Sequence, residues 1–451
     1  MSMMQGKKWK LWLLLAPLTT VALAQPQYGT KPVATLDLTL EQAIDIALEE
    51  NPTIHVADQE VELKKIANTE AWQALLPEVS ATASLEHTLL AAEMNLGGNK
   101  FKMGQDNTNT AAASATLSLP LFVPGVYQNM KLTKKDIELA LEQARESRLD
   151  LINQVTKAYY NALLSQDSRD VMEESYKISK ENYDVVKAKY DVGSVSEYDA
   201  LTAEVQMRSI HSSLISTETS LKIAKLQLLV LMGVTENVDV HINDRLENYE
   251  DGQTLPVIDS EEGSLQNNTT MRQFELNRDI LERTLKMNRT NFMPTLSFSL
   301  TGQYQSLYNT NWELWNYDYS PSASFGFTIS IPIFTASNWT TIKKTKVQLA
   351  ELEENRVNTE RQLAMSVESY RQNMAASIAQ TASNKEAVRQ ADKAVTIAAK
   401  RYEVGKGTIL ELNQSELSLT EAKLTYNQSI YDYLTNLADL EYALGRETYL
   451  Q

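Results

Sequence analysis

The sequence contains the same series of motifs twice, separated by a constant interval. Thr116–Phe122 reads TLSLPLF and Thr328–Phe334 reads TISIPIF, a displacement of 212 positions. The same displacement relates two further pairs, Lys189–Gly193 with Arg401–Gly405 and Gly233 with Gly445. Because no insertion has entered either stretch, the sequence predicts one structural unit present in duplicate, with long rigid elements between the matched motifs.

The first 24 residues have the layout of a secretory signal. Three lysines precede an apolar run, Leu11–Leu23, and a small-residue cleavage site ends at Ala24, so we expect the mature chain to begin at Gln25. The net charge of −16 becomes more negative without those lysines, which argues against nucleic acid or an anionic membrane surface as partner. The chain has no cysteine, which excludes disulfides, thiolate metal sites and a cysteine-borne lipid anchor.

Most of the remaining chain is predicted to be helical. Thr39 and Gln42 form a capping-box pattern at the start of a first helix, which Asn51-Pro52 ends, and a second helix is expected from about Thr53 to Leu76. Long helices are expected at about 128–190 and 338–402, each followed by a tip (191–196 and 403–408). Return helices then run to 232 and 445. Double apolar stripes along the long helices favour a ring of helices over packing on a globular core.

Four segments alternate with a period of two and are predicted to be strands: about 78–88, 111–122, 294–304 and 323–334. Each pair forms a hairpin with one apolar face and one hydroxyl-rich face. The segment between the first pair is expected to be a polar, Gly-containing loop. The loop between the second pair contains aromatic residues, which suit a membrane-boundary girdle, an outward-facing loop or a merely sticky surface: Trp312, Trp315, Tyr317 and Tyr319.

Strands of about 10 residues are long enough to cross a tilted path through a bilayer. Four strands cannot close on themselves, and open sheet edges are not tolerated in lipid, so a membrane location requires several chains to pool their strands. Two chains would give eight strands and an interior filled by side chains, whereas three would give twelve and leave a passage. The predicted fold is therefore mainly α with a small transmembrane β part, trimeric if the molecule conducts.

These features resemble the outer-membrane efflux protein family of TolC-like channels. The resemblance rests on the opening LTLEQAIDIALEENPTI, the Leu76-Pro77 junction, the paired TLSLPLF and TISIPIF strands, and the Tyr-x-x-Gly turns at Tyr190 and Tyr402. It implies a homotrimer with a 12-stranded β-barrel in the outer membrane of a Gram-negative bacterium and an α-helical tunnel across the periplasm. Residues 25–236 would be the first repeat, 237–270 an equatorial linker and 271–451 the second repeat.

The resemblance also implies a function and partners. Such a channel serves a tripartite efflux pump or a type I secretion system as a passive conduit, and receives substrate from an inner-membrane transporter through a periplasmic adaptor protein. The adaptor would dock at the tip, whose residues here are Val192, Gly193, Ser194, Val404, Gly405, Lys406 and Gly407. Inward-pointing acids close the tunnel in family members, and the candidates for that periplasmic gate here are Asp392, Arg389, Tyr183 and Asp184.

Other classes of protein are less compatible with the sequence. A periplasmic coiled-coil adaptor or a scaffold protein of an export complex remains an alternative, although an adaptor would need a body of many short strands. Catalysis is not indicated, because the four histidines are scattered without ligand spacing and no Gly-rich loop follows a strand, and no cofactor is expected. Residues 234–270 are acidic and are expected to form a solvated elaboration. The transported substrate and the particular pump are not encoded in any motif.

Overall fold

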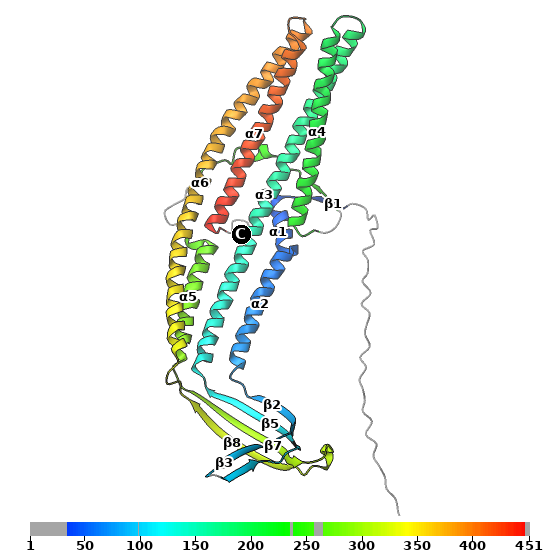
Figure 1. Ribbon diagram of the computed structural model, residues 1–451. Coiled ribbons are helices and arrows are strands. Elements are labelled where there is room, and N and C mark those ends of the chain that lie inside the picture. Colours follow the sequence, from blue (N-terminus) through cyan, green and yellow to red (C-terminus); the bar gives the residue numbers. More distant parts are fainter. Residues whose placement is uncertain (1–33, 98, 235–237, 257–264, 447–451) are drawn as a thin grey trace, which may run out of the picture.

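The computed structural model describes residues 34–97, 99–234, 238–256 and 265–446 and is mainly helical with a small β part. Long helices run side by side, a four-stranded sheet extends from one end of them, and the helix-to-helix turns lie at the opposite end (Figure 1). The predicted signal, residues 1–24, lies outside the described residues. Among the described helices, none combines the length and the hydropathy needed to cross a membrane.

The first two helices begin as the sequence predicts. α1 (Leu40–Glu50) is preceded by the Thr39–Gln42 capping box, and α2 (Pro52–Gln73) by Asn51, whose side chain accepts the Thr53 N–H at 2.8 Å. α2 ends three residues before the predicted Leu76. The N–H groups at 75 and 76 bond to carbonyls three residues back, which is a tight turn, because the following proline disfavours α geometry in the residue before it.

The two long helices have the same length. α3 (Pro124–Asp191) and α6 (Ala336–Glu403) each contain 68 residues, roughly 100 Å at 1.5 Å per residue, and they extend slightly beyond the predicted ranges. Each turns back into a shorter helix, α4 (Glu197–Leu231) or α7 (Ile409–Leu444). Gly193 and Gly405 adopt φ of +76° and +72° at these turns, which is why glycine follows the helix end in both copies.

The base of each return helix packs against the start of another helix in the same way. Asn51 Nδ2 donates to the Leu231 carbonyl at 2.7 Å, and Asn268, the N-cap of α5 (Thr269–Thr290), donates to the Ala443 carbonyl at 2.8 Å. A Cβ at Gly445 would lie 2.1 Å from a backbone carbonyl oxygen, so this close approach requires glycine. The duplication therefore extends to this contact, which the motif spacing did not reveal.

The sheet joins the two copies through its central pair. Its order is β2 (Glu78–Thr88), β5 (Thr108–Phe122), β7 (Thr295–Asn309) and β8 (Ser320–Ser330), all antiparallel. The register confirms the two predicted faces. One row across the four strands is apolar (Val79, Leu117, Leu300 and Phe325), and the adjacent row carries hydroxyls (Ser80, Thr116, Thr301 and Ser324).

Two β features differ from the prediction. β8 ends at Ser330 instead of 334, because its last partner, Thr295, is the first residue of β7 and no strand remains to pair with the rest. The loop between β2 and β5 was wrongly expected to lack strands. It contains a small hairpin of β3 (Ala92–Leu96) and β4 (Asn99–Met103), in which Met94 pairs with Phe101.

The segment after α4 is more than a solvated elaboration. β6 (Val238–His241) pairs in parallel with β1 (Ala34–Asp37), and Val240, Ile242 and Leu246 are buried in the main apolar core. Short 3₁₀ turns follow at η1 (Leu246–Tyr249), η2 (Leu265–Asn267) and, within the β7–β8 loop, η3 (Leu314–Asn316). The prediction of a wholly solvated segment was wrong, because apolar residues spaced among the acids anchor it. Residues 257–264 lie outside the described part.

Candidate functional site: the helical tips

The two predicted tips lie at the same end of the molecule, far from the sheet (Figure 1). Val192 and Val404 project from their turns with 76% and 66% of their surface exposed. The turns are built alike, since the N–H of Ser194 bonds to the Lys189 carbonyl and the N–H of Lys406 to the Arg401 carbonyl, each at 2.8 Å. The tip is thus a pair of matched, hydrogen-bonded turns that present backbone and valine side chains.

A small apolar cluster behind the turns joins the two hairpins. Its buried members come from three helices: Val186, Ala203, Ile409 and Leu412. Lys189 Nζ of α3 lies 4.9 Å from the ring centroid of Tyr402 on α6, a cation–π distance that links the hairpins further. Burial raises the pKa of the Tyr402 hydroxyl, with Asp199 adding to the effect. The tips of the protomer therefore share one packed base.

An apolar groove runs between α4 and α7 beside this cluster. Large side chains line it and remain exposed, which leaves apolar surface available next to the tips: Tyr198, Leu201, Val205, Leu410 and Leu417. Polar side chains, including Asn413 and Gln414, complete the lining. This mixture of an apolar floor and amide groups suits an amphipathic helix better than a small charged ligand.

The predicted gate residues lie on two different helices of the protomer. Asp392 and Arg389 lie exposed on α6, whereas Tyr183 and Asp184 lie on α3, and α7 packs between these two helices (Figure 1). Arg389 bonds instead to Glu386, 2.5 Å away, and this guanidinium lowers the pKa of the Glu386 carboxyl to about 2. Tyr183 packs against the apolar cluster behind the tips, with Lys187 above its ring.

Polar contacts join α3 and α7 in addition to the apolar core that both helices enter. Lys157 on α3 bonds to Asp439 on α7 at 2.9 Å, and nearer the tips the pairs are Glu174 with Lys423 (2.6 Å), Ser175 with Thr420 (3.1 Å) and Asn182 with Glu416 (2.5 Å). We call these contacts the α3–α7 seam. The seam was not predicted from the sequence, although one signal for it was present. Glu416 falls four residues after Leu412 and three before Leu419, on the buried stripe of α7.

Comparison with known proteins identifies the class of molecule. The family model for outer membrane efflux proteins matches residues 43–234 and 262–446. The chain is 20% identical over 418 residues to outer membrane protein TolC of Vibrio cholerae, covering 92% of this chain and 93% of that protein. It is 22% identical over 416 residues to the alkaline protease secretion protein AprF of Pseudomonas aeruginosa, with coverage of 89% and 83%. The crystal structure of CusC superposes with a TM-score of 0.74 at 18% identity, covering 92% and 94%.

The fold is accordingly that of the outer-membrane channels with a long periplasmic helical tunnel. Since the family model covers most of its length, the chain belongs to the outer membrane efflux protein family. It is an outer-membrane channel protein of efflux or type I secretion, as the family resemblance implied. The names of these two relatives describe outer-membrane and secretion proteins.

Proposed function

We propose that three copies of this chain form a continuous conduit, a 12-stranded barrel in the outer membrane joined to a tunnel of α-helices. The observation that carries this proposal is the open four-stranded sheet. β2 and β8 are its edges, and each leaves a row of backbone groups to be paired. Lipid does not tolerate such edges, so β8 of one copy would pair with β2 of the next.

The side chains of the sheet support a lipid-facing and a lumen-facing surface. Phe325, Phe327 and Ile329 of β8 have 64% to 73% of their surface exposed on one face. On the other face hydroxyls bond across strands, Thr82 to Ser114 at 2.8 Å and Thr116 to Thr301 at 3.1 Å. Glu78 and Glu86 of β2 lie on this hydroxyl face as well. An apolar exterior and a polar interior are the pattern of a membrane barrel with an aqueous passage.

The tips would receive a periplasmic adaptor, which connects the channel to an inner-membrane transporter. Matched turns at Gly193 and Gly405 offer six equivalent positions in a trimer, and the groove between α4 and α7 continues from them. A helical hairpin could lay its apolar stripe in that groove while its turn meets the tip. Transport through the conduit would be passive, with energy supplied by the inner-membrane partner.

Three measurements test this proposal: the mass of the particle, its conduction of ions and its capture of the adaptor. Protein extracted from outer membranes in mild detergent is expected to have the mass of three chains, and to conduct ions when reconstituted in planar bilayers. The matched variant pair Val404→Asp and Lys406→Ala then tests docking, because a charge on the exposed valine should weaken adaptor capture more than loss of the exposed lysine. A monomer that remains in solution without detergent would contradict the proposal.

A further inference from the structure

Glu416 is a buried acid that the channel function does not yet explain. It lies in the α3–α7 seam with only 7% of its surface exposed. Its Oε1 accepts a hydrogen bond from Asn182 Nδ2 at 2.5 Å, and in the described part of the chain it forms no ion pair with any lysine, arginine or histidine. A carboxylate at such a site would be a desolvated charge without a counter-ion, which is a costly state.

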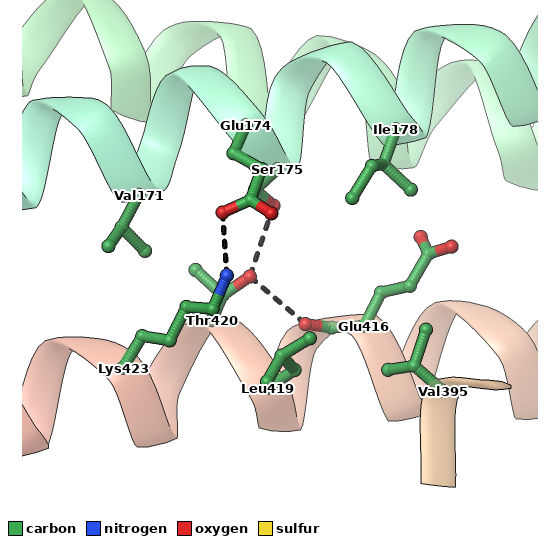
Figure 2. Close-up of a pocket in the computed structure, with 9 residues that line it drawn as sticks. All are labelled: Val171, Glu174, Ser175, Ile178, Val395, Glu416, Leu419, Thr420 and Lys423. Carbon is green, nitrogen blue, oxygen red and sulfur yellow. Dashed lines mark hydrogen bonds and ion pairs between the residues drawn. The ribbon is translucent and has the colours of Figure 1, made fainter. Parts of the chain in front are cut away.

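The polar groups near Glu416 are bonded to one another, since Figure 2 shows Glu174 paired with Lys423 and Ser175 with Thr420. A cavity of about 30 Å³ adjoins the side chain, enough for a water molecule. The charged groups that line it are Glu174 of α3 and Lys423 of α7, and these bond to each other at 2.6 Å. α6 contributes only Val395 to the lining, and α4 contributes nothing. The one cation at the cavity is therefore engaged by Glu174.

We propose that Glu416 is a proton-binding site of the α3–α7 seam, neutral while the two helices are packed and ionised when they separate. Separation of the seam would admit water to the carboxyl and remove the desolvation that favours its neutral form. The hydrogen bond from Asn182 is compatible with a neutral acid, whose carbonyl oxygen accepts it.

The pH dependence of the seam's stability follows from the difference in protonation between its packed and separated states. Burial raises the pKa of Glu416, and the Asn182 hydrogen bond opposes that rise only in part. The packed seam thus binds the proton more tightly than the separated one. Its extra stability is fully present below the ordinary glutamate pKa of about 4.3, and is lost as pH rises through the raised pKa of the packed state. Low pH therefore stabilises the packing of the α3–α4 hairpin against the α6–α7 hairpin.

Any effect of this packing on conduction depends on the proposed channel function, whereas the protonation state of Glu416 does not. The most direct test is infrared spectroscopy of the purified, cysteine-free protein, comparing wild type with Glu416→Gln. The spectrum of wild type minus that of Glu416→Gln is expected to contain the carbonyl band of a buried protonated carboxylic acid in mildly acidic solution. Glu421→Gln, an exposed acid on the same helix, is the control and should leave the band unchanged. A difference spectrum without that band would overturn the proposal, whereas bands common to both proteins come from other buried acids such as Asp167.

A distance measurement tests the coupling to movement. Because the chain contains no cysteine, spin labels can be placed at Val192→Cys and Val404→Cys alone. The distance between the labelled tips should lengthen or broaden as pH rises from about 5 to about 8, and Glu416→Gln should keep the short distance throughout. If that variant does not assemble, Asn182→Leu replaces it and should move the response to higher pH. A pH response unchanged by either substitution would contradict the coupling. A normal band and distance response in a protein that conducts no ions would contradict the channel function alone.

Discussion

The two long helices have equal lengths and very different surroundings. α3 buries 17 of its 68 residues, whereas α6 buries 4 of 68. α3 packs against α1, α2, α4, α5 and α7, while α6 packs mainly against α7 and α5. Duplication therefore supplied two similar helices, but only one became the interior of the protomer. α6 lies at an edge of the protomer. Its exposed side chains are therefore available for a contact with another copy of the chain.

The exposed side chains of α6 indicate where that contact lies. Val347 and Met365 are 63% and 69% exposed and stand 18 residues apart, which is five helical turns and places them on the same face. Ile397 lies within about 40° of that face. On the other side of the protomer α4 exposes Ile223, Leu226 and Val230, also at helical spacing. A neighbouring copy that joins α6 to α4 would cover both stripes.

The largest expected effect is on assembly. Val347→Glu combined with Met365→Glu would bury charges without partners at each contact between copies, so we expect the oligomer to be lost while the helix content of the chain remains. Gln348→Glu with Asn355→Glu adds the same charge on a different face of α6 and is the control. Mass measurement in detergent distinguishes the two, and an intact oligomer in the first variant would remove α6 from the interface.

The next prediction compares a variant that weakens folding of the chain with one that weakens assembly of the oligomer. Leu163 of α3 is fully buried, so Leu163→Ala should cost about 2–5 kcal/mol of stability through lost packing and a cavity. Met365→Ala on α6 should leave the free energy of unfolding of the isolated chain nearly unchanged and shorten the lifetime of the oligomer. Denaturant unfolding followed by circular dichroism measures the first quantity. Equal losses for both variants would mean that α3 and α6 are equally buried in the protomer.

The proposed gate gives a smaller effect that depends on which side of α6 faces the lumen. If three copies of Asp392 surround a narrow passage, Asp392→Ala should raise the closed-state conductance and weaken its preference for cations. Arg389→Ala, Tyr183→Phe and Asp184→Ala would show whether those residues tether the closed state across copies. Planar-bilayer recording is the measurement. Conductance of Asp392→Ala equal to that of wild type would discard the assignment.

The smallest effect concerns the buried side of α3. The carboxylate of Asp167 accepts the Leu246 N–H at 3.0 Å and so ties the equatorial segment to α3. Burial raises its pKa, so the stability it contributes is greatest below the ordinary pKa of aspartate and declines as pH rises through the raised value. Asp167→Asn should flatten this dependence slightly. Hydrogen exchange of residues 238–249 at two pH values tests it, and an unaltered profile would contradict the assignment.

Much of the fold was predictable because its boundaries are set locally. Thr39, Asn51, Gly193 and Gly405 are caps whose side chains or backbone freedom act within a few residues, and period-two alternation located all four strands of the main sheet. The end of β8 was not predictable in this way, since it depends on where β7 runs out. The β3–β4 hairpin was missed because five-residue strands carry too little pattern.

The site was less accessible to sequence reasoning than the fold. The tip residues followed from the turns. α7 separates Asp392 on α6 from Tyr183 and Asp184 on α3 within one protomer, so the gate stays a prediction about contacts between copies. The α3–α7 seam joins residues more than 230 positions apart, such as Asn182 and Glu416, and no local pattern pairs them. Anchoring of the segment after α4 likewise depends on Val240 and Leu246 meeting a core built from distant helices.

The central claim is that one protomer is incomplete along both of its edges, the strand edges β2 and β8 and the helix α6. The most direct test is the mass of the protein extracted from outer membranes, measured in detergent with the bound detergent subtracted. The account predicts three chains per particle. Particles of one chain, or of two, would contradict it, since neither four nor eight strands enclose an aqueous passage.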